Sequence, residues 1–283
     1  MLKKLGSILD AVRARRGRSV DDLLEQLSHA EARSRWEAAE ALGRHSGEAR
    51  VAEALVKALG DPHPFVRWEA VESLAQRKDE RTFILLKAEL SSTNARRRSS
   101  VADALGRLGD KRAASGLCGA LASRNAEVRR SAAEALARLG DPTTLRELRR
   151  ALGDEDTHVR RAAVNALGAI GSSEAVAALL TMLEDKAALV RASAAEALGR
   201  IADASATHPL RKALTDPDPG VRWHAVHALG AVGDKAVVPA LEPLLCDATE
   251  IFGVSIAEAA QSAMEAIEGR QKDQEQARRL RSS

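Results

Sequence analysis

The sequence is poor in the residues that many functions need. Aromatic residues make up 2% of its 283 positions, and there are two cysteines, Cys118 and Cys246. No apolar run approaches the ~20 residues of a membrane span, and the amino terminus lacks the continuous apolar stretch of a signal peptide. A glycine-rich phosphate loop and a Cys-x-x-Cys pair are also missing. We therefore expect no membrane span and no secretory leader.

A short motif recurs along the chain at a nearly constant spacing. Its clearest copy is Val-Arg-Arg-Ala-Ala-Val-Asn-Ala-Leu-Gly-Ala-Ile-Gly, at residues 159–171. Successive copies are 31 residues apart, except for 32 at the first step and 35 at the last. Such a period is typical of a solenoid, in which each unit buries its apolar face only against its neighbours. An arginine marks the copies at Arg35, Arg67, Arg98, Arg129, Arg160, Arg191 and Arg222, and Ala257 replaces it in the eighth.

Each copy has the pattern of a pair of α-helices. With the arginine at position 0 and 100° per residue, positions −1, +3, +4, +7 and +10 share one apolar face, and positions +1, +2, +5 and +9 are predicted to face solvent. Glycine at +11, followed by Asp or Ser at +12, predicts a left-handed helix end and the N-cap of the next helix. That helix carries a Leu-x-x-x-Leu spacing, as in Leu148 and Leu152.

The marker arginine lies at the edge of the buried face, so its charge needs a partner. An aspartate stands six residues upstream in four copies, at Asp61, Asp154, Asp185 and Asp216. We predict that this aspartate, in the turn before the helix, pairs with the arginine.

The Val-Arg-x-x-Ala-Ala-x-Ala-Leu-Gly-x-Ile-Gly core and the preceding aspartate resemble the HEAT-like repeats named after phycobilisome lyases, over roughly residues 20–268. The resemblance implies an armadillo-type fold, a right-handed all-α solenoid (an alpha-alpha superhelix) of eight helix pairs whose second helices line the concave surface. It implies no single function, because such repeats occur in scaffolds, lyases and hydroxylases alike.

The pattern divides the chain into a basic amphipathic segment (1–18), eight repeats (19–268) and a polar tail (269–283) that we expect to be frayed. The net charge of +3 is the sum of +5 in the first segment, +3 in the tail and −5 in the repeats. An acidic body argues against a nucleic-acid groove. Within residues 1–16, apolar residues share one helical face, which predicts either a cap on the first repeat or contact with an anionic membrane surface: Leu2, Leu5, Ile8, Leu9 and Val12.

All three tryptophans, Trp36, Trp68 and Trp223, occupy position +1 of their repeats. Exposed tryptophan is scarce on monomer surfaces and enriched at binding hot spots, although each indole could instead fold back along its own helix. Carboxylates surround the first two tryptophans and favour a partner with basic side chains, unless arginines four residues away neutralise them. The predicted partner-binding set is completed by Glu37, Glu40, Glu69, Glu72, Arg130, Arg161, His224 and His227.

Residues for catalysis are few. The repeat geometry brings no Ser/His/Asp set together, so we predict no catalytic residue, no cofactor and, on balance, no enzyme. His224 and His227 share one helical face, which could hold a divalent metal or contact a partner; we expect no metal. The HEAT-repeat deoxyhypusine hydroxylase looks similar and holds two irons through His-Glu pairs at +1 and +2. Here those positions read Trp36-Glu37, Trp68-Glu69 and Trp223-His224, so the resemblance implies that the di-iron site is absent.

Two classes of function remain. One is a non-catalytic scaffold that binds a protein or peptide on the concave surface. The other is an enzyme or chaperone resembling phycobilin lyases, whose tryptophans would stack on a tetrapyrrole while Arg130 and Arg161 pair with its propionates. Because the two cysteines lie four repeats apart, no disulfide is expected and a cytoplasmic location is predicted.

Overall fold

The computed structural model describes residues 18–45 and 47–282, so the predicted amphipathic helix at 1–16 lies outside the described residues. The described chain contains sixteen α-helices and almost no sheet, which confirms the predicted all-α solenoid. None of these helices is long and apolar enough to cross a membrane. The chain divides into two compact units, of which the first ends at Leu139 and the second begins at Gly140.

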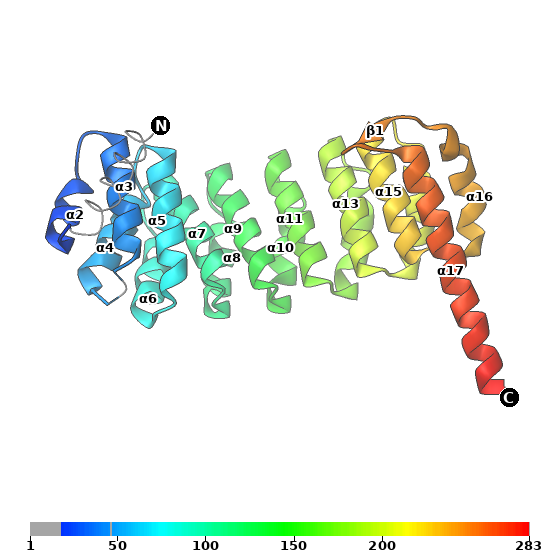
Figure 1. The fold of residues 1–283 in the computed structure, drawn as a ribbon, viewed down its shortest axis with the longest axis horizontal. Helices are drawn as coiled ribbons and strands as arrows, with labels where there is room; N and C mark the ends of the chain where they lie inside the picture. Colours follow the sequence, from blue (N-terminus) through cyan, green and yellow to red (C-terminus); the bar gives the residue numbers. More distant parts are fainter. Residues whose placement is uncertain (1–17, 46, 283) are drawn as a thin grey trace, which may run out of the picture. The chain divides into compact units, whose positions relative to one another are not determined.

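The first unit contains four helix pairs, coloured blue to green in Figure 1. We call the first helix of each pair an A helix and the second a B helix. The A helices are α2 (Val20–Gln26), α4 (Ala49–Ala58), α6 (Glu80–Glu89) and α8 (Ala114–Ala120), the last entered through the 3-10 turn η1 (Lys111–Ala113). The B helices are α3 (Ala32–Gly43), α5 (Pro64–Arg77), α7 (Ala95–Leu108) and α9 (Ala126–Leu139).

The second unit contains four further pairs. Its A helices are α10 (Leu145–Ala151), α12 (Val176–Met182), α14 (Thr207–Ala213) and α16 (Val238–Leu241). They are preceded by the 3-10 turns η2 (Pro142–Thr144), η3 (Ser173–Ala175), η4 (Ala204–Ala206) and η5 (Lys235–Val237), and η6 (Glu242–Cys246) continues α16. The B helices are α11 (Thr157–Ile170), α13 (Ala188–Ile201), α15 (Pro219–Val232) and α17 (Ile256–Ser282).

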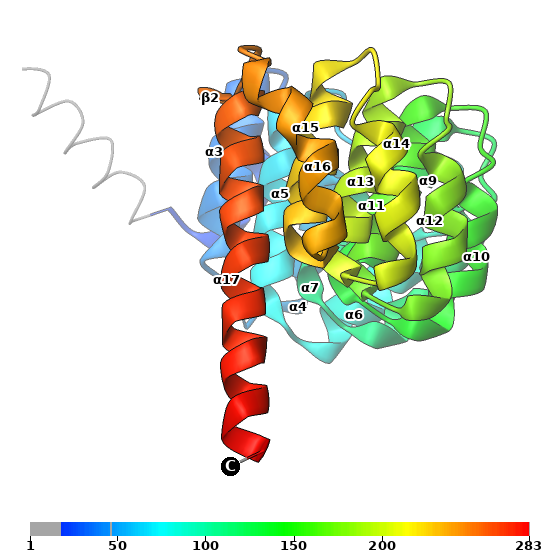
Figure 2. The same ribbon diagram turned by 90° about the vertical axis from the view of Figure 1, so that its right-hand side faces the viewer.

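The last repeat departs from the sequence-based expectation in two ways. The last repeat step is 35 residues long instead of 31, and the segment that contains the four additional residues forms a small antiparallel hairpin. In this hairpin β1 (Glu250–Ile251) pairs with β2 (Val254–Ser255), so the all-α prediction, which allowed no strands, was wrong at this point. The segment 269–283 was expected to be frayed, but α17 continues through it to Ser282. Figures 1 and 2 show the carboxyl-terminal part of α17 running on past α15 and α16.

The core lies between the A and B layers of each unit and consists mainly of leucine and alanine. The largest fully buried side chains are all leucines, among them Leu55, Leu74 and Leu105 in the first unit and Leu148 and Leu167 in the second. Apolar burial of this kind provides the main stabilisation of repeat arrays.

Adjacent B helices approach each other very closely. A Cβ built on Gly106 of α7, at position +8 of its repeat, would lie 2.7 Å from Cα of Ala135 on α9, so a larger residue here would require the two helices to move apart. This contact also corrects the predicted solvent face, because a neighbouring B helix covers positions +1 and +2 in several copies. Ser99 and Ser131 are buried and hydrogen-bonded to each other at 2.9 Å, and Ser193 is buried as well.

The predicted helix ends are confirmed at most positions. Gly109, Gly140 and Gly171 adopt the left-handed conformation, with φ of 76°, 56° and 70°. Gly233 does not, because its backbone is extended, with φ of −73°. The N-cap side chains predicted at +12 each accept a backbone N–H of the following 3-10 turn: Asp110, Asp141, Ser172, Asp203 and Asp234.

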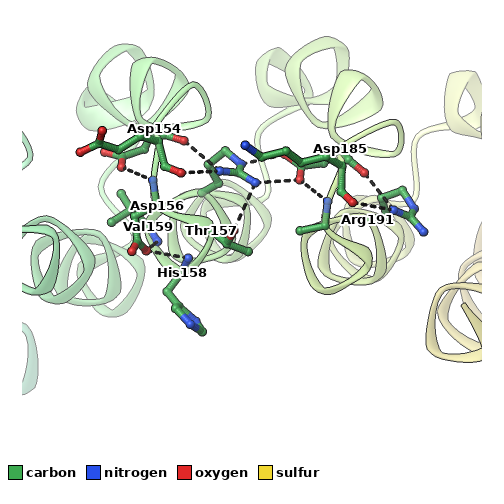
Figure 3. Close-up of polar contacts among 11 residues, drawn as sticks. Asp154, Asp156, Thr157, His158, Val159, Asp185 and Arg191 are labelled. Carbon is green, nitrogen blue, oxygen red and sulfur yellow. Dashed lines mark hydrogen bonds and ion pairs between the residues drawn. The ribbon is translucent and has the colours of Figure 1, made fainter.

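The marker arginines connect successive repeats, and here the sequence suggested the wrong partner. Arg160 donates from Nη1 to the backbone carbonyl of Asp154, six residues upstream, at 3.0 Å. Its carboxylate partner is Asp185 of the next repeat, at 2.8 Å from Nε and 2.9 Å from Nη2. Figure 3 shows Asp154 and Asp185 on neighbouring turns, with Arg191 beyond them. The same inter-repeat ion pair joins Arg35 to Asp61, Arg191 to Asp216 and Arg222 to Asp247.

Candidate functional site

An apolar groove lies at the amino-terminal ends of α3 and α5 in the first unit. It has a volume of about 610 Å³, and we call it the aromatic groove. Pro64 starts α5 at its first position, where the ring suits the helix geometry; this start places Phe65 and Trp68 on the first turn of the helix. The groove is lined by Ala32, Arg33, Trp36, His63, Phe65 and Trp68.

The aromatic side chains of the groove differ in how firmly they are held. Trp36 is half-buried, and its Nε1–H donates to Oε2 of Glu69 across the two repeats at 3.1 Å. Phe65 is 67% exposed and Trp68 is 51% exposed. The ring of His63 lies 5.6 Å from that of Phe65. One indole therefore forms a fixed wall, while two large apolar side chains remain open to solvent.

None of the four predicted carboxylates lines the groove itself, and most of them have basic neighbours. Glu37 accepts from Arg33 at 3.1 Å, and Glu40 accepts from Arg44 at 2.8 Å. Glu72 contacts Arg107 of the next repeat. The acidic row is thus largely neutralised by arginines of the same surface, which was one of the two alternatives left open by the sequence.

Glu69 is the exception among these carboxylates. Its side chain accepts from the Trp36 indole, and no cation of the described residues lies within ion-pair distance of it. Burial raises the pKa of Glu69, and the charges of Glu40 and Glu72 add to this rise, whereas the Trp36 hydrogen bond and the charge of Arg44 oppose it. A positively charged group of a partner that reached Glu69 would therefore form an ion pair that this carboxylate does not have within the described chain.

Arg130 lies in a second, more polar hollow of the first unit, with a volume of about 320 Å³. Its guanidinium pairs with Glu134 at 3.1 Å, and Arg138 pairs with Asp103 at 2.8 Å. Arg161 is half-buried on α11, which belongs to the second unit.

The third tryptophan belongs to a separate aromatic cluster in the second unit. The ring of Trp223 lies 3.9 Å from that of His227, 5.0 Å from that of His224 and 5.7 Å from that of Phe252, which is 87% exposed on the hairpin. Trp223, His224 and His227 border a hollow of about 280 Å³ that Glu196 and Arg200 also line. Trp223 therefore packs within its own unit and is only half-buried.

Burial lowers the pKa of both histidines in this cluster and so favours their neutral forms. It lowers the pKa of His224, against the charge of Glu196 and together with that of Arg200. Burial also lowers the pKa of His227, and the charge of His224 acts in the same direction. Across the described residues, no three His, Cys, Asp or Glu side chains gather in a group that could hold a metal ion.

Sequence reasoning did not identify Phe65, His63 and Phe252. His63 and Phe65 could have been found from the His-Pro-Phe sequence that precedes Trp68, because a proline at the first helical position fixes where the helix starts. Phe252 has a φ of 54° at the turn of the hairpin, and no repeat position predicted this conformation.

The helix pairs described above coincide with the repeats that a known family model matches in this sequence. The family model for HEAT repeats matches residues 20–106, 114–198 and 179–262. The chain belongs to the HEAT-repeat family. The model for the PBS lyase HEAT-like repeat also matches residues 97–123, which confirms the resemblance to the phycobilisome-lyase type. No curated protein matches this HEAT-repeat chain.

Solved structures resemble this HEAT-repeat protein in fold. The Escherichia coli protein YibA has a TM-score of 0.65 at 20% identity, over 92% of this chain and 96% of that chain. A chain of the Kap95p–RanGDP structure has a TM-score of 0.62 at 16% identity, over 88% of this chain and 41% of that chain. An engineered protein has a TM-score of 0.51 at 24% identity, over 88% and 78%. Identities this low show the fold alone.

Proposed function

We propose that this HEAT-repeat protein is a non-catalytic scaffold that binds a protein or peptide partner in the aromatic groove. The observation that carries the proposal is the exposure of Phe65 and Trp68 beside the fixed indole of Trp36. Exposed clusters of large aromatic side chains are scarce on monomers and enriched at binding hot spots.

The surrounding charges define the chemistry of the partner. Among the described residues Glu69 forms no ion pair, and the charges of Glu40 and Glu72 raise its pKa while that of Arg44 lowers it. A partner segment with one or two apolar anchors and a neighbouring Lys or Arg would fill the groove and compensate this carboxylate. Trp223, His224 and His227 form a second proposed contact surface. We place the protein in the cytoplasm, as the two widely spaced cysteines suggest.

The tetrapyrrole alternative gains no support from the site. The charge of Arg130 is already paired with Glu134 within the first unit. Incubation with a bilin should therefore leave the visible absorption of the pigment unchanged.

Selection from a phage-displayed random peptide library on the full-length chain tests the proposed function. We expect enriched peptides to carry apolar anchors beside Lys or Arg. The combined substitution Phe65→Ala and Trp68→Ala should weaken their binding by about 2 kcal/mol, roughly 30-fold, in calorimetry. Ile84→Ala is the matched control, because Ile84 is also an exposed large apolar residue, at 57%, but lies on α6. Equal binding by the double variant and the control would refute the proposal.

A further inference from the structure

The aromatic groove leaves two large apolar side chains open to solvent. Phe65 is 67% exposed and Trp68 is 51% exposed, and both border the same hollow as Trp36. A patch of this kind marks a docking surface and is a liability for association when nothing covers it. Covering these side chains would therefore be favourable even in the absence of an external partner.

The electrostatics at the groove restrict what this occupant can be. Trp36 lies between the apolar wall and Glu69, to which its indole donates at 3.1 Å. Glu40 and Glu72 are bonded to Arg44 and Arg107, whereas Glu69 has no such ion pair within the described chain. A suitable occupant combines an apolar face with a Lys or Arg that reaches Glu69.

One segment of this chain has that chemistry. Residues 1–17 carry apolar side chains at helical spacing together with an excess of basic ones, Lys3, Lys4, Arg13, Arg15 and Arg16 against Asp10. The apolar members are Leu2, Leu5, Ile8, Leu9 and Val12.

The attachment point of this segment also allows it to reach the groove. The described chain begins at Arg18, immediately before the N-cap Ser19 of α2. Helix α2 packs on α3, the helix that carries Trp36. Seventeen residues span at most about 56 Å when extended, or about 25 Å as a helix, whereas the twelve residues of α3 span only about 18 Å.

We infer that residues 1–17 dock in the aromatic groove of the same chain, with the apolar face on Phe65 and Trp68 and a basic side chain beside Glu69. A tethered segment has an effective concentration in the millimolar range, so even a weak contact fills the groove most of the time. The segment then acts as an internal competitor that an external partner must displace. The inference rests on the proposed function only for this consequence, since the contact itself needs no partner.

The test uses the full-length chain with Trp223→Phe, which leaves both remaining indoles in the groove. Leu5→Asp combined with Leu9→Asp should release the segment. We expect the emission of Trp36 and Trp68 to shift to longer wavelength and acrylamide quenching to rise about twofold. A synthetic peptide of residues 1–17 should reverse both changes in this variant and bind it at least tenfold more tightly than it binds the parent chain. Glu69→Gln in the same background should weaken the peptide, and Ile84→Asp alone should change nothing.

Unchanged emission and quenching in Leu5→Asp/Leu9→Asp, with no binding of the peptide, would overturn the inference. So would a peptide that binds only vesicles of phosphatidylcholine and phosphatidylserine, because the segment would then serve a membrane surface. If that variant loses helicity, Lys3→Glu with Lys4→Glu gives the same comparison through charge alone. A failure here leaves the Phe65- and Trp68-dependent binding of selected peptides untouched, so the two proposals fail separately.

Discussion

Replacement of Asp185 by alanine should destabilise the second unit far more than its position in a turn suggests. The side chains of Arg160 and Asp185 are 5% and 8% exposed, and the carboxylate accepts from both Nε and Nη2 of the guanidinium. Removal of one partner leaves a buried charge without its counter-ion, which typically costs 3–5 kcal/mol. We expect about 3 kcal/mol, the lower limit, because Nη1 of Arg160 keeps its bonds to the carbonyls of Asp154 and Glu155.

Urea unfolding of the full chain, followed by circular dichroism, measures this effect. Glu184→Ala is the control, since Glu184 is the exposed neighbour of Asp185 and should cost less than about 0.5 kcal/mol. Because the ion pair joins two repeats, Asp185→Ala should also broaden the transition as cooperativity between repeats is lost. A cost within 1 kcal/mol of the control value would refute the view that these ion pairs hold the repeats together.

The pH dependence of the same variant gives an independent check. Burial by itself would raise the pKa of Asp185, but the hydrogen bonds from Arg160 and from the Ala187 N–H, with the charge of Arg160, lower it overall. The stabilisation is therefore fully present above the unfolded-state pKa of about 3.9 and is lost as the pH falls through the lower folded-state value. The difference between wild type and Asp185→Ala should accordingly shrink in acid.

Three further predictions concern packing, charge and metal binding. Gly106→Ala should destabilise the first unit by about 1–3 kcal/mol in urea unfolding, because the new Cβ would lie 2.7 Å from Cα of Ala135, whereas Gly47→Ala, with open space around it, should not. Glu69→Gln should raise the unfolding midpoint at pH 7 and not below pH 4. The reason is that the raised folded-state pKa of Glu69 makes its ionised form destabilise the folded protein as the pH rises. An equal gain at both pH values would contradict this. Protein purified without chelators should contain no stoichiometric iron, zinc or manganese, and metal that is lost on His224→Ala would overturn this prediction.

The helix pairs followed directly from the sequence because each repeat carries its own local signals. Val159, Leu167 and Gly171 already define a buried face and a helix end, and the structure has them there. The partner of Arg160 did not follow, because the carboxylate comes from a residue 25 positions downstream and depends on how one repeat stacks on the next. A period seen along the chain gives the repeat but not the contacts between repeats.

The candidate site could be predicted only in part for a similar reason. Position +1 pointed to Trp36 and Trp68, and the structure places both at one groove. The same register put Ser99 on the solvent face, yet it is buried against Ser131, because adjacent B helices approach closely enough to cover it. The exposure of Phe65 depends on where α5 begins. Phe65 also lies two residues before the marker arginine, outside the positions that the repeat pattern predicted to face solvent.

Hydroxyl-radical footprinting of the full-length chain carrying Leu5→Asp and Leu9→Asp, which keeps residues 1–17 out of the groove, tests the central claim most directly when it is done with and without a selected peptide. Aromatic side chains report on their own solvent exposure, and mass spectrometry separates the oxidation of individual residues. The proposed function predicts that bound peptide protects Phe65 and Trp68, the exposed members of the aromatic groove, while Trp223 and Phe252 keep their oxidation rates. Protection confined to Trp223 and Phe252, or bound peptide without protection of either cluster, would contradict it.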